Sequence, residues 1–151
     1  MPTVMLRLSE GVSVVVPVYN GAEILPSLVS RLEPVLYALG APGELILVND
    51  ASGDGSWELI RDMAGGKRWL RGIDLAANRG QQGALLCGIA AARFGVTVTM
   101  DDDLQHPPEE IPKLLARLGE GFDVVYGVPD APHRGPWRSA AGAGGGWVIL
   151  K

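Results

Sequence analysis

Several kinds of residue are scarce in this sequence, and each shortage excludes a class of protein. The 151 residues include one cysteine, Cys87, so the chain has no internal disulfide and no multi-cysteine metal site. Its surroundings, "GALLCGIAAA", predict a small buried hydrophobe rather than a reactive thiol. The formal net charge is -4 and the positive residues are scattered, which argues against nucleic acid as the general partner.

Long apolar runs are also absent. The first residues, "MPTVMLRLSEG", lack the basic start and the long apolar core of a signal peptide. No uninterrupted apolar run approaches the ~20 residues that a membrane-spanning helix needs. We therefore expect a cytoplasmic chain whose membrane contact is at most peripheral, at the cytoplasmic face.

The residues that are present favour one folded core built from alternating strands and helices. With 47% hydrophobic residues, a chain of this length buries one core. Strand and helix patterns alternate, which predicts an α/β fold with a mostly parallel sheet and helices on both faces. Strands are expected at 12–19, 44–50, 70–75, 96–100 and 122–127, and helices at 23–39, 56–64, 80–94 and 108–118.

Polar segments follow three of the predicted strands. They read "PVYNGAE", "NDASGDGS" and "DDDLQHPP". In an open parallel sheet, ligands bind beyond the carboxyl ends of the strands, where helix amino termini also offer N–H groups. The three segments are therefore predicted to form one site.

The three aspartates after the fourth strand are candidate metal ligands. Asp101 and Asp103 form a D-x-D pair whose hard oxygens can hold Mg²⁺ or Mn²⁺ and leave positions open for phosphate oxygens. The alternative is that aspartates simply cap the next helix. Three of them exceed what one cap needs, and their mutual repulsion costs energy unless a cation relieves it. Asp102, which points the other way along an extended segment, is the weaker ligand candidate.

Two other strand ends carry candidate nucleotide contacts. Asp50 could accept hydrogen bonds from a ribose or a base, although an Asx turn or a cap opening the "SGDGS" loop explains it equally well. After Pro17, Tyr19 and Asn20 present an aromatic face and an amide, but an aromatic residue such as Tyr19 is more often half-buried in a core.

The segment "NRGQQGALLCGI" precedes a helix rich in small residues. Arg79 could meet phosphate there, and Gly80 and Gly83 would allow close backbone approach. The spacing is not the G-x-G-x-x-G of dinucleotide folds, and a lone glycine-rich turn more often reflects tight packing. His106 is at least as typical of a helix cap or a loop residue as of a general base.

Four motifs in register resemble glycosyltransferase family 2, whose members have the nucleotide-diphospho-sugar transferase (GT-A) fold. They are "VVVPVYNGAE", "LILVNDASGDGS", "NRGQQGALLCGI" and "MDDDLQHPPEEIP", and the resemblance spans about residues 11–138. The form "DDDLQHPPE", with "VVYGVP" after it, is similar to the branch that transfers sugars to polyprenyl phosphates.

The resemblance implies roles for individual residues. The metal shell is Asp101 and Asp103, joined by Gln105, and the residues assigned to catalysis are Asp103 and Arg138. Contacts with the acceptor phosphate fall on Arg134, Arg138 and Ser139, for which solvated loop charges are an equally good explanation. The candidate donor-nucleotide contacts are Pro17, Tyr19, Asn20, Glu23, Asp50, Arg79, Gly80, Asp101 and Asp102.

The implied function is the metal-dependent, inverting transfer of a sugar from a UDP- or GDP-linked donor to a polyprenyl (dolichyl or undecaprenyl) phosphate. A phosphate monoester is already ionised near neutral pH, so no general base is required. The alternatives are a nucleotide-sugar-binding module without catalysis and a family 2 transferase that acts on a saccharide. A sugar nucleotidyltransferase is disfavoured because no glycine-rich pyrophosphorylase loop follows the first strand.

The chain is expected to divide near residue 127. Residues 1–127 are the predicted nucleotide-sugar-binding core, and 128–151 an incomplete acceptor-side segment with a loose glycine-rich tail. Family members continue well past this point, so donor binding is better supported than turnover. Apolar surface left uncovered on a shortened sheet favours self-association, which makes a homo-oligomer a candidate state.

Overall fold

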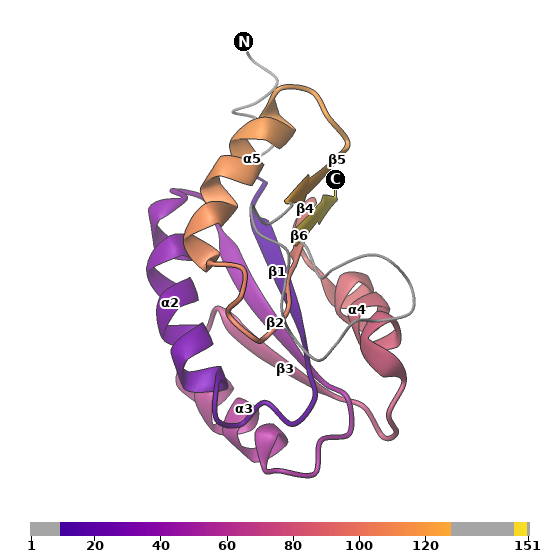
Figure 1. The fold of residues 1–151 in the computed structure, drawn as a ribbon. Coiled ribbons are helices and arrows are strands. Elements are labelled where there is room, and N and C mark those ends of the chain that lie inside the picture. The colour runs from indigo at the N-terminus through magenta and orange to yellow at the C-terminus, as the bar shows by residue number, and fades with distance from the viewer. Residues whose placement is uncertain (1–9, 128–146, 151) are drawn as a thin grey trace.

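The computed structural model describes residues 10–127 and 147–150, which form a six-stranded sheet in the order β3-β2-β1-β4-β6-β5 (Figure 1). The strands are β1 (Val12–Val18), β2 (Gly43–Asn49), β3 (Leu70–Asp74), β4 (Val96–Thr99), β5 (Val124–Gly127) and β6 (Trp147–Leu150). The helices are α2 (Leu25–Ala38), α3 (Ser56–Gly65), α4 (Gly80–Ala91) and α5 (Ile111–Gly119), and a 3-10 turn, η1, spans Pro108–Glu110.

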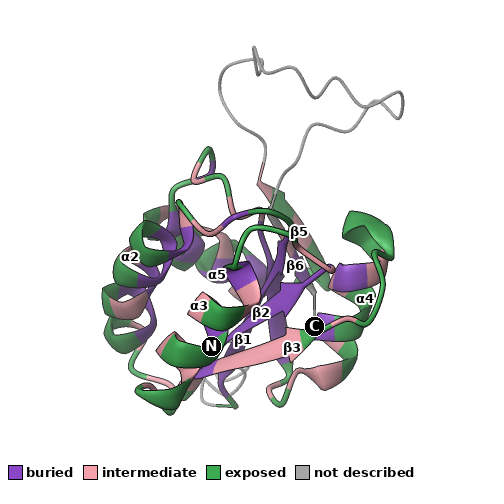
Figure 2. Ribbon diagram, turned by 90° about the horizontal axis from the view of Figure 1, so that it is seen from below, coloured by how far each residue is buried: buried purple, intermediate pink, exposed green. Residues whose placement is uncertain are grey.

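The first four strands are parallel, as the alternation of strand and helix patterns predicts. β1 lies at the centre of the sheet and is buried along its whole length, which agrees with its nearly continuous run of valines (Figure 2). Its pairing with β4 stops at Val15, so Pro17 lies beyond that ladder, where a missing N–H breaks no pairing. β1 therefore runs further toward the carboxyl edge of the sheet than β4 does.

Helices cover both faces of the sheet, and the predicted α/β class is confirmed. α2, α3 and α5 lie on one face, and α4 lies on the other (Figure 1). Alternate residues of β1 serve the two faces, since Val14 and Val16 belong to the larger core and Val15 packs in a smaller core with Ala84 of α4. Gly88 brings α4 close to the sheet, because a Cβ there would overlap the side chain of Val15.

The tail contributes a strand that the sequence patterns did not predict. The expectation of a loose tail is wrong for Trp147–Leu150, which forms β6, antiparallel to both β4 and β5. Ile149 is fully buried, so this short apolar run is ordered by tertiary packing and by the open edge of β4. Residues 128–146 lie outside the described part, and the division of the chain near residue 127 stays a prediction.

The position of Cys87 was predicted wrongly. Its side chain is exposed rather than buried, and its neighbour Leu86 is 68% exposed. α4 has apolar residues on all sides, and its two buried residues, Ala84 and Gly88, are small ones that face the sheet. Within the described residues, no helix combines the length and the apolar composition needed to cross a bilayer.

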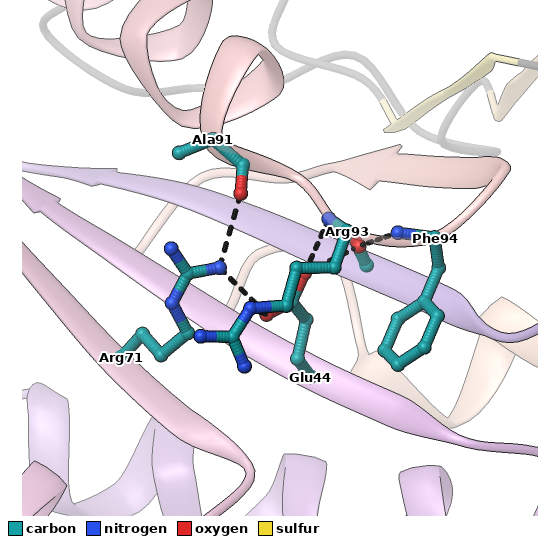
Figure 3. Close-up of polar contacts among 6 residues, drawn as sticks. Glu44, Arg71, Ala91, Arg93 and Phe94 are labelled. Atoms are coloured by element: carbon teal, nitrogen blue, oxygen red, sulfur yellow. Dashed lines mark hydrogen bonds and ion pairs between the residues drawn. The ribbon is translucent and has the colours of Figure 1, made fainter.

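A buried carboxylate fastens the amino edge of the sheet, where β1 and β2 begin (Figure 3). Glu44 of β2 is 3% exposed and accepts hydrogen bonds from Ser13 Oγ (2.8 Å), the Arg93 backbone N–H (2.8 Å) and Arg71 Nη1 (2.9 Å). Arg71 also donates to the carbonyl of Ala91, at the end of α4. Glu44 thereby joins β1, β2, β3 and the segment that follows α4.

Candidate functional site

Three loops meet at the carboxyl edge of the parallel strands. They follow β1, β2 and β4, and each contains one non-glycine residue in the left-handed region, namely Asn20 (φ 51°), Ala51 (φ 56°) and Leu104 (φ 57°). Asparagine tolerates this conformation, but it is unfavourable for alanine and leucine and is often found where a backbone is held for function. Strained backbone therefore gathers where the ligand site is predicted.

The loops after β1 and β2 are fastened together by hydrogen bonds, an arrangement we term the loop clasp. Three successive backbone N–H groups of the β1 loop donate to side chains of the β2 loop. These bonds run from Asn20 to Ser52 Oγ (2.9 Å), from Gly21 to Ser56 Oγ (3.0 Å) and from Ala22 to Asp54 Oδ2 (3.1 Å). In return, the backbone N–H of Gly53 donates to Asn20 Oδ1 (2.9 Å), so the two loops are bonded in both directions.

Sequence reasoning missed the clasp residues Ser52, Asp54 and Ser56. Asp54 accepts from the backbone N–H of Ser56 at 3.1 Å, a local turn that the D-x-S spacing could have indicated. Burial acts to raise the pKa of Asp54, but hydrogen bonds from Ser56 and Ala22 outweigh it and hold the pKa below its ordinary value. Tyr19, beside the clasp, is 58% exposed rather than half-buried, so its ring is available at this edge.

Asp50 links the end of β2 to the start of α4, the helix that covers the opposite face of the sheet from α2, α3 and α5. It is 3% exposed, and its Oδ1 accepts a hydrogen bond from the backbone N–H of Arg79 at 2.6 Å. Asn78 Nδ2 also donates to the Asp50 carbonyl at 3.3 Å. The carboxylate therefore positions the start of α4. This role was not predicted, either by the interpretation of Asp50 as a nucleotide contact or by its interpretation as an Asx turn or cap.

The start of α4 is shaped by two glycines with different roles. Gly80 adopts φ +78° with open space around its Cα, so glycine is favoured there by conformation. A Cβ at Gly83 would lie 2.8 Å from Arg79 Cβ, so glycine at that position leaves room for the arginine side chain. Gln81, which was not predicted, donates a hydrogen bond to Asp101. It thereby joins α4 to residues 101–103, which we term the acidic motif.

The acidic motif turns at Asp102 and Asp103 instead of continuing as an extended strand. Asp103 Oδ1 accepts from the backbone N–H of Gln105 at 3.0 Å, which is a local Asx turn within the loop. Neither η1 nor α5 is capped by a side chain, so the capping alternative is wrong. The carboxylate of Asp102 lies against Gly21 of the β1 loop. Burial raises the pKa of Asp102 to about 6, and the negative charges of Asp103, Asp101 and Asp54 add to the effect.

The donor atoms of the motif suit a metal ion that is shared with a ligand. Among the described residues, no three His, Cys, Asp or Glu side chains are grouped so that they could hold a metal alone. No ion pair between described residues neutralises Asp102 or Asp103, and the crowded charges leave a cation favoured. Mg²⁺ commonly takes one or two protein carboxylates and completes its shell with phosphate oxygens and water. Asp101, Asp103 and the exposed Gln105 fit that type of site.

The remaining predicted residues fall in different places. Pro17 is buried in β1, while Glu23 is exposed and lines a shallow pocket of about 360 Å³ with Asn20 and Leu104. His106 is 5% exposed, which suits a packing residue beneath the loop rather than a base at the edge. Arg134, Arg138 and Ser139 lie outside the described residues.

Comparison with known proteins points to the same family that the sequence motifs resemble. Residues 13–142 match the sequence profile of the family described as Glycosyl transferase family 2. The chain is 47% identical over 117 residues to the undecaprenyl-phosphate 4-deoxy-4-formamido-L-arabinose transferase of Aeromonas hydrophila subsp. hydrophila, with 76% of this chain and 35% of the relative covered. The chain thus spans about a third of that relative's length.

Two solved structures are similar to the fold. Glucosyl-3-phosphoglycerate synthase from Mycobacterium tuberculosis, in complex with Mn²⁺, UDP and phosphoglyceric acid, matches with a TM-score of 0.65 at 27% identity, covering 82% of this chain and 45% of that one. A mannosyltransferase from Pyrobaculum calidifontis, in complex with GDP-Man and Mn²⁺, matches with a TM-score of 0.61 at 24% identity, covering 78% and 35%. The second likeness shows the fold alone.

Proposed function

Because the chain belongs to glycosyl transferase family 2, we propose that it binds a nucleotide-diphosphate sugar at the carboxyl edge of its sheet and transfers the sugar to a polyprenyl phosphate. The observation that carries the proposal is the meeting of the β1 loop, the β2 loop and the acidic motif beside the start of α4. Parallel α/β sheets bind ligands at this edge.

The donor nucleotide is proposed to contact the exposed ring of Tyr19, the β2 end at Asp50 and the amino terminus of α4 at Arg79 and Gly80. Anionic groups are favoured at a helix amino terminus because its N–H groups lack partners within the helix. UDP and GDP are both candidate carriers. UDP has the additional support of the mycobacterial synthase, which binds UDP together with Mn²⁺.

Asp101, Asp103 and Gln105 are proposed to hold Mg²⁺ or Mn²⁺. When bound, the ion supplies Lewis-acid chemistry that neutralises charge on a departing diphosphate. Asp103 is the proposed catalytic carboxylate, and Asp101, fixed by Gln81, keeps the motif beside α4. Mutual repulsion of the three aspartates is the feature of this chain that favours a cation here.

The transfer is proposed as a single displacement with inversion. An oxygen of the acceptor phosphate forms a bond to the anomeric carbon while the bond from that carbon to the diphosphate breaks. The acceptor oxygen is already ionised near neutral pH, so the protein needs to orient it rather than deprotonate it. Arg134, Arg138 and Ser139 are the proposed acceptor-phosphate residues, with Arg138 also assisting catalysis.

The polyprenyl acceptor is supported by the 47% identical Aeromonas protein, whose name specifies undecaprenyl phosphate. A lipid acceptor implies that this chain contacts a membrane surface peripherally. We also propose self-association through β5, one of the two edge strands of the described sheet, because it exposes Val124 and Tyr126.

A second candidate is a nucleotide-sugar-binding module without catalysis. It is favoured by the described contacts, since those of the loop clasp, Asp50 and Gln81 all lie at the proposed donor side. Transfer of a sugar to a polyprenyl phosphate by this chain alone would exclude the second candidate.

Titration calorimetry with UDP- and GDP-sugars, with Mn²⁺ and with EDTA, tests the shared part of both candidates. We expect binding of at least one nucleotide sugar that depends on the metal. A matched pair of variants localises the site, since Asp103→Asn should abolish the metal-dependent part and Asp62→Asn, on α3, should not. Absence of metal-dependent binding to every donor would remove the basis of the proposal.

A further inference from the structure

The place of Asp102 is not accounted for by a metal site or by a helix cap. Its carboxylate turns toward the β1 loop, whereas Asp101 is held from α4 by Gln81. A Cβ built on Gly21 would lie 2.6 Å from Asp102 Oδ2 and 3.2 Å from Val18 Cγ1. The carboxylate of Asp102 therefore occupies the space that a side chain at residue 21 would take.

Space, not backbone conformation, is the reason for glycine at residue 21. Gly21 is buried, and it is not among the glycines with positive φ, so an L-residue could adopt its backbone angles. Only the close approach of Asp102 and Val18 excludes a side chain. The absence of a side chain at Gly21 thus leaves the space that the carboxylate of Asp102 fills.

The other side of Gly21 is fixed by the loop clasp. Its backbone N–H donates to Ser56 Oγ at 3.0 Å, and its neighbours Asn20 and Ala22 donate to Ser52 and Asp54. The peptide at Gly21 is consequently held between the β2 loop and the acidic motif. The loop clasp by itself fixes the β1 loop only to the β2 loop. The described contact that joins Gly21 to the acidic motif is the one with Asp102.

We propose that Asp102 is a positioning residue, which packs on Gly21 and sets the distance between the β1 loop and the metal-binding carboxylates. This inference rests on the proposed function and deepens it. A nucleoside diphosphate would contact the β1 loop through its nucleoside and the acidic motif through its phosphates, so both contacts form together only when this distance is fixed. A loop that must be ordered on binding lowers affinity.

The test compares variants matched in charge but different in shape. Asp102→Asn and Asp102→Ala both remove the negative charge, and only the asparagine keeps the group that packs on Gly21. Gly21→Ala adds a methyl group where Asp102 lies, and the double variant Gly21→Ala/Asp102→Ala exchanges the volume between the two positions. The readouts are the Kd of UDP and of GDP at saturating Mn²⁺ by calorimetry and the Kd of Mn²⁺ alone by electron paramagnetic resonance, below each variant's melting temperature.

We expect Asp102→Ala and Gly21→Ala each to weaken the nucleotide Kd by about tenfold or more, and Asp102→Asn to weaken it clearly less than Asp102→Ala does. The double variant should recover most of that loss. Affinity for Mn²⁺ alone should be equal in Asp102→Asn and Asp102→Ala, which a general loss of structure would not produce.

Different failures point to different errors. Equal weakening by Asp102→Asn and Asp102→Ala would show that charge matters and shape does not, and would overturn the positioning role. The same holds if neither variant changes the Kd, or if the double variant is no better than the single ones. If the unaltered chain binds neither UDP nor GDP with Mn²⁺, the proposed function itself fails and the positioning role falls with it.

Discussion

The carboxylate of Asp50 accepts a hydrogen bond from the backbone N–H of Arg79 at 2.6 Å, and this contact joins the end of β2 to the start of α4. The first N–H groups of a helix have no partner within the helix, so an acceptor from another element helps to fix the helix start. Asp50 is buried, which makes the bond sensitive to loss of either partner. The hydrogen bond therefore fixes the carboxyl end of β2 and the amino end of α4 relative to each other, and both ends face the proposed ligand.

Replacing Asp50 should separate its structural role from its proposed nucleotide contact. Asp50→Ala leaves the Arg79 N–H without its acceptor and should lower the free energy of unfolding by about 1–3 kcal/mol in urea titrations. Asp50→Asn keeps an acceptor oxygen and should lower it by less than half as much. If Asp50 contacts the nucleotide, Asp50→Asn should nevertheless weaken UDP or GDP binding. Equal destabilisation by both variants would contradict the assigned contact.

Glu44 should make the protein sensitive to acid. Burial acts to raise the pKa of Glu44, but hydrogen bonds from Arg71, the Arg93 N–H and Ser13 outweigh it and hold the pKa below its ordinary value of 4.5. A carboxylate with a lowered pKa stabilises the fold above the pKa of the unfolded chain, and this contribution is lost as the pH falls through the folded pKa.

The measurement is urea unfolding between about pH 7 and pH 3 for the unaltered chain and Glu44→Gln. At neutral pH the variant should be less stable by about 2 kcal/mol, because Arg71 loses a buried charged partner. That difference should shrink as the pH falls below about 4.5. A difference that is the same at every pH would show that the charge of Glu44 does not stabilise the fold.

The close approach of α4 to the sheet can be tested at Gly88. A Cβ at Gly88 would overlap Val15 and lie 3.0 Å from Val48 Cγ2, so Gly88→Ala should destabilise the fold by about 1–3 kcal/mol. Gly65→Ala is the matched control, because Gly65 is also helical and has open space around its Cα. The control should be neutral or slightly stabilising, since alanine favours helix. Similar unfolding energies for the two variants would mean that α4 packs less tightly than described.

Self-association through β5 predicts a mass that rises with concentration in light scattering. Val124 and Tyr126 lie on one face of this strand and are 40% and 68% exposed. Val124→Lys places a charge on that face and should shift the protein toward the monomer. A control change at Tyr37, which is 72% exposed on α2, should leave the mass unchanged. An unaltered chain that stays monomeric at all concentrations would count against this interface.

Much of the fold could be predicted because its signals are local. β1 and β2 are nearly continuous runs of branched apolar residues, and the helical patterns between strands repeat at three or four residues. β6 could not be predicted in this way, because four residues after a glycine-rich stretch become a strand only when β4 and β5 pair with them. Cys87 was misplaced for a related reason, since a helix that is apolar on all sides does not reveal which face meets the sheet.

The candidate site was predictable as a location but not in its contacts. The order of strands and polar loops was enough to place Tyr19, Asp50 and the acidic motif at one edge. The hydrogen bonds from the β1 loop to Ser52 and Asp54 join residues more than thirty apart, which no local pattern reveals. The nucleotide, metal and acceptor roles of the individual residues stay predictions.

The most direct test of the central claim is the thermal midpoint of the unaltered chain with UDP- and GDP-sugars, each with Mn²⁺ and with EDTA. A ligand that binds only the folded state at 100 times its Kd stabilises it by about 2.7 kcal/mol. We predict a rise of several degrees with at least one nucleotide sugar in Mn²⁺, none in EDTA and none in Mn²⁺ with Asp103→Asn. A midpoint that no nucleotide sugar raises in the presence of Mn²⁺ would contradict the account.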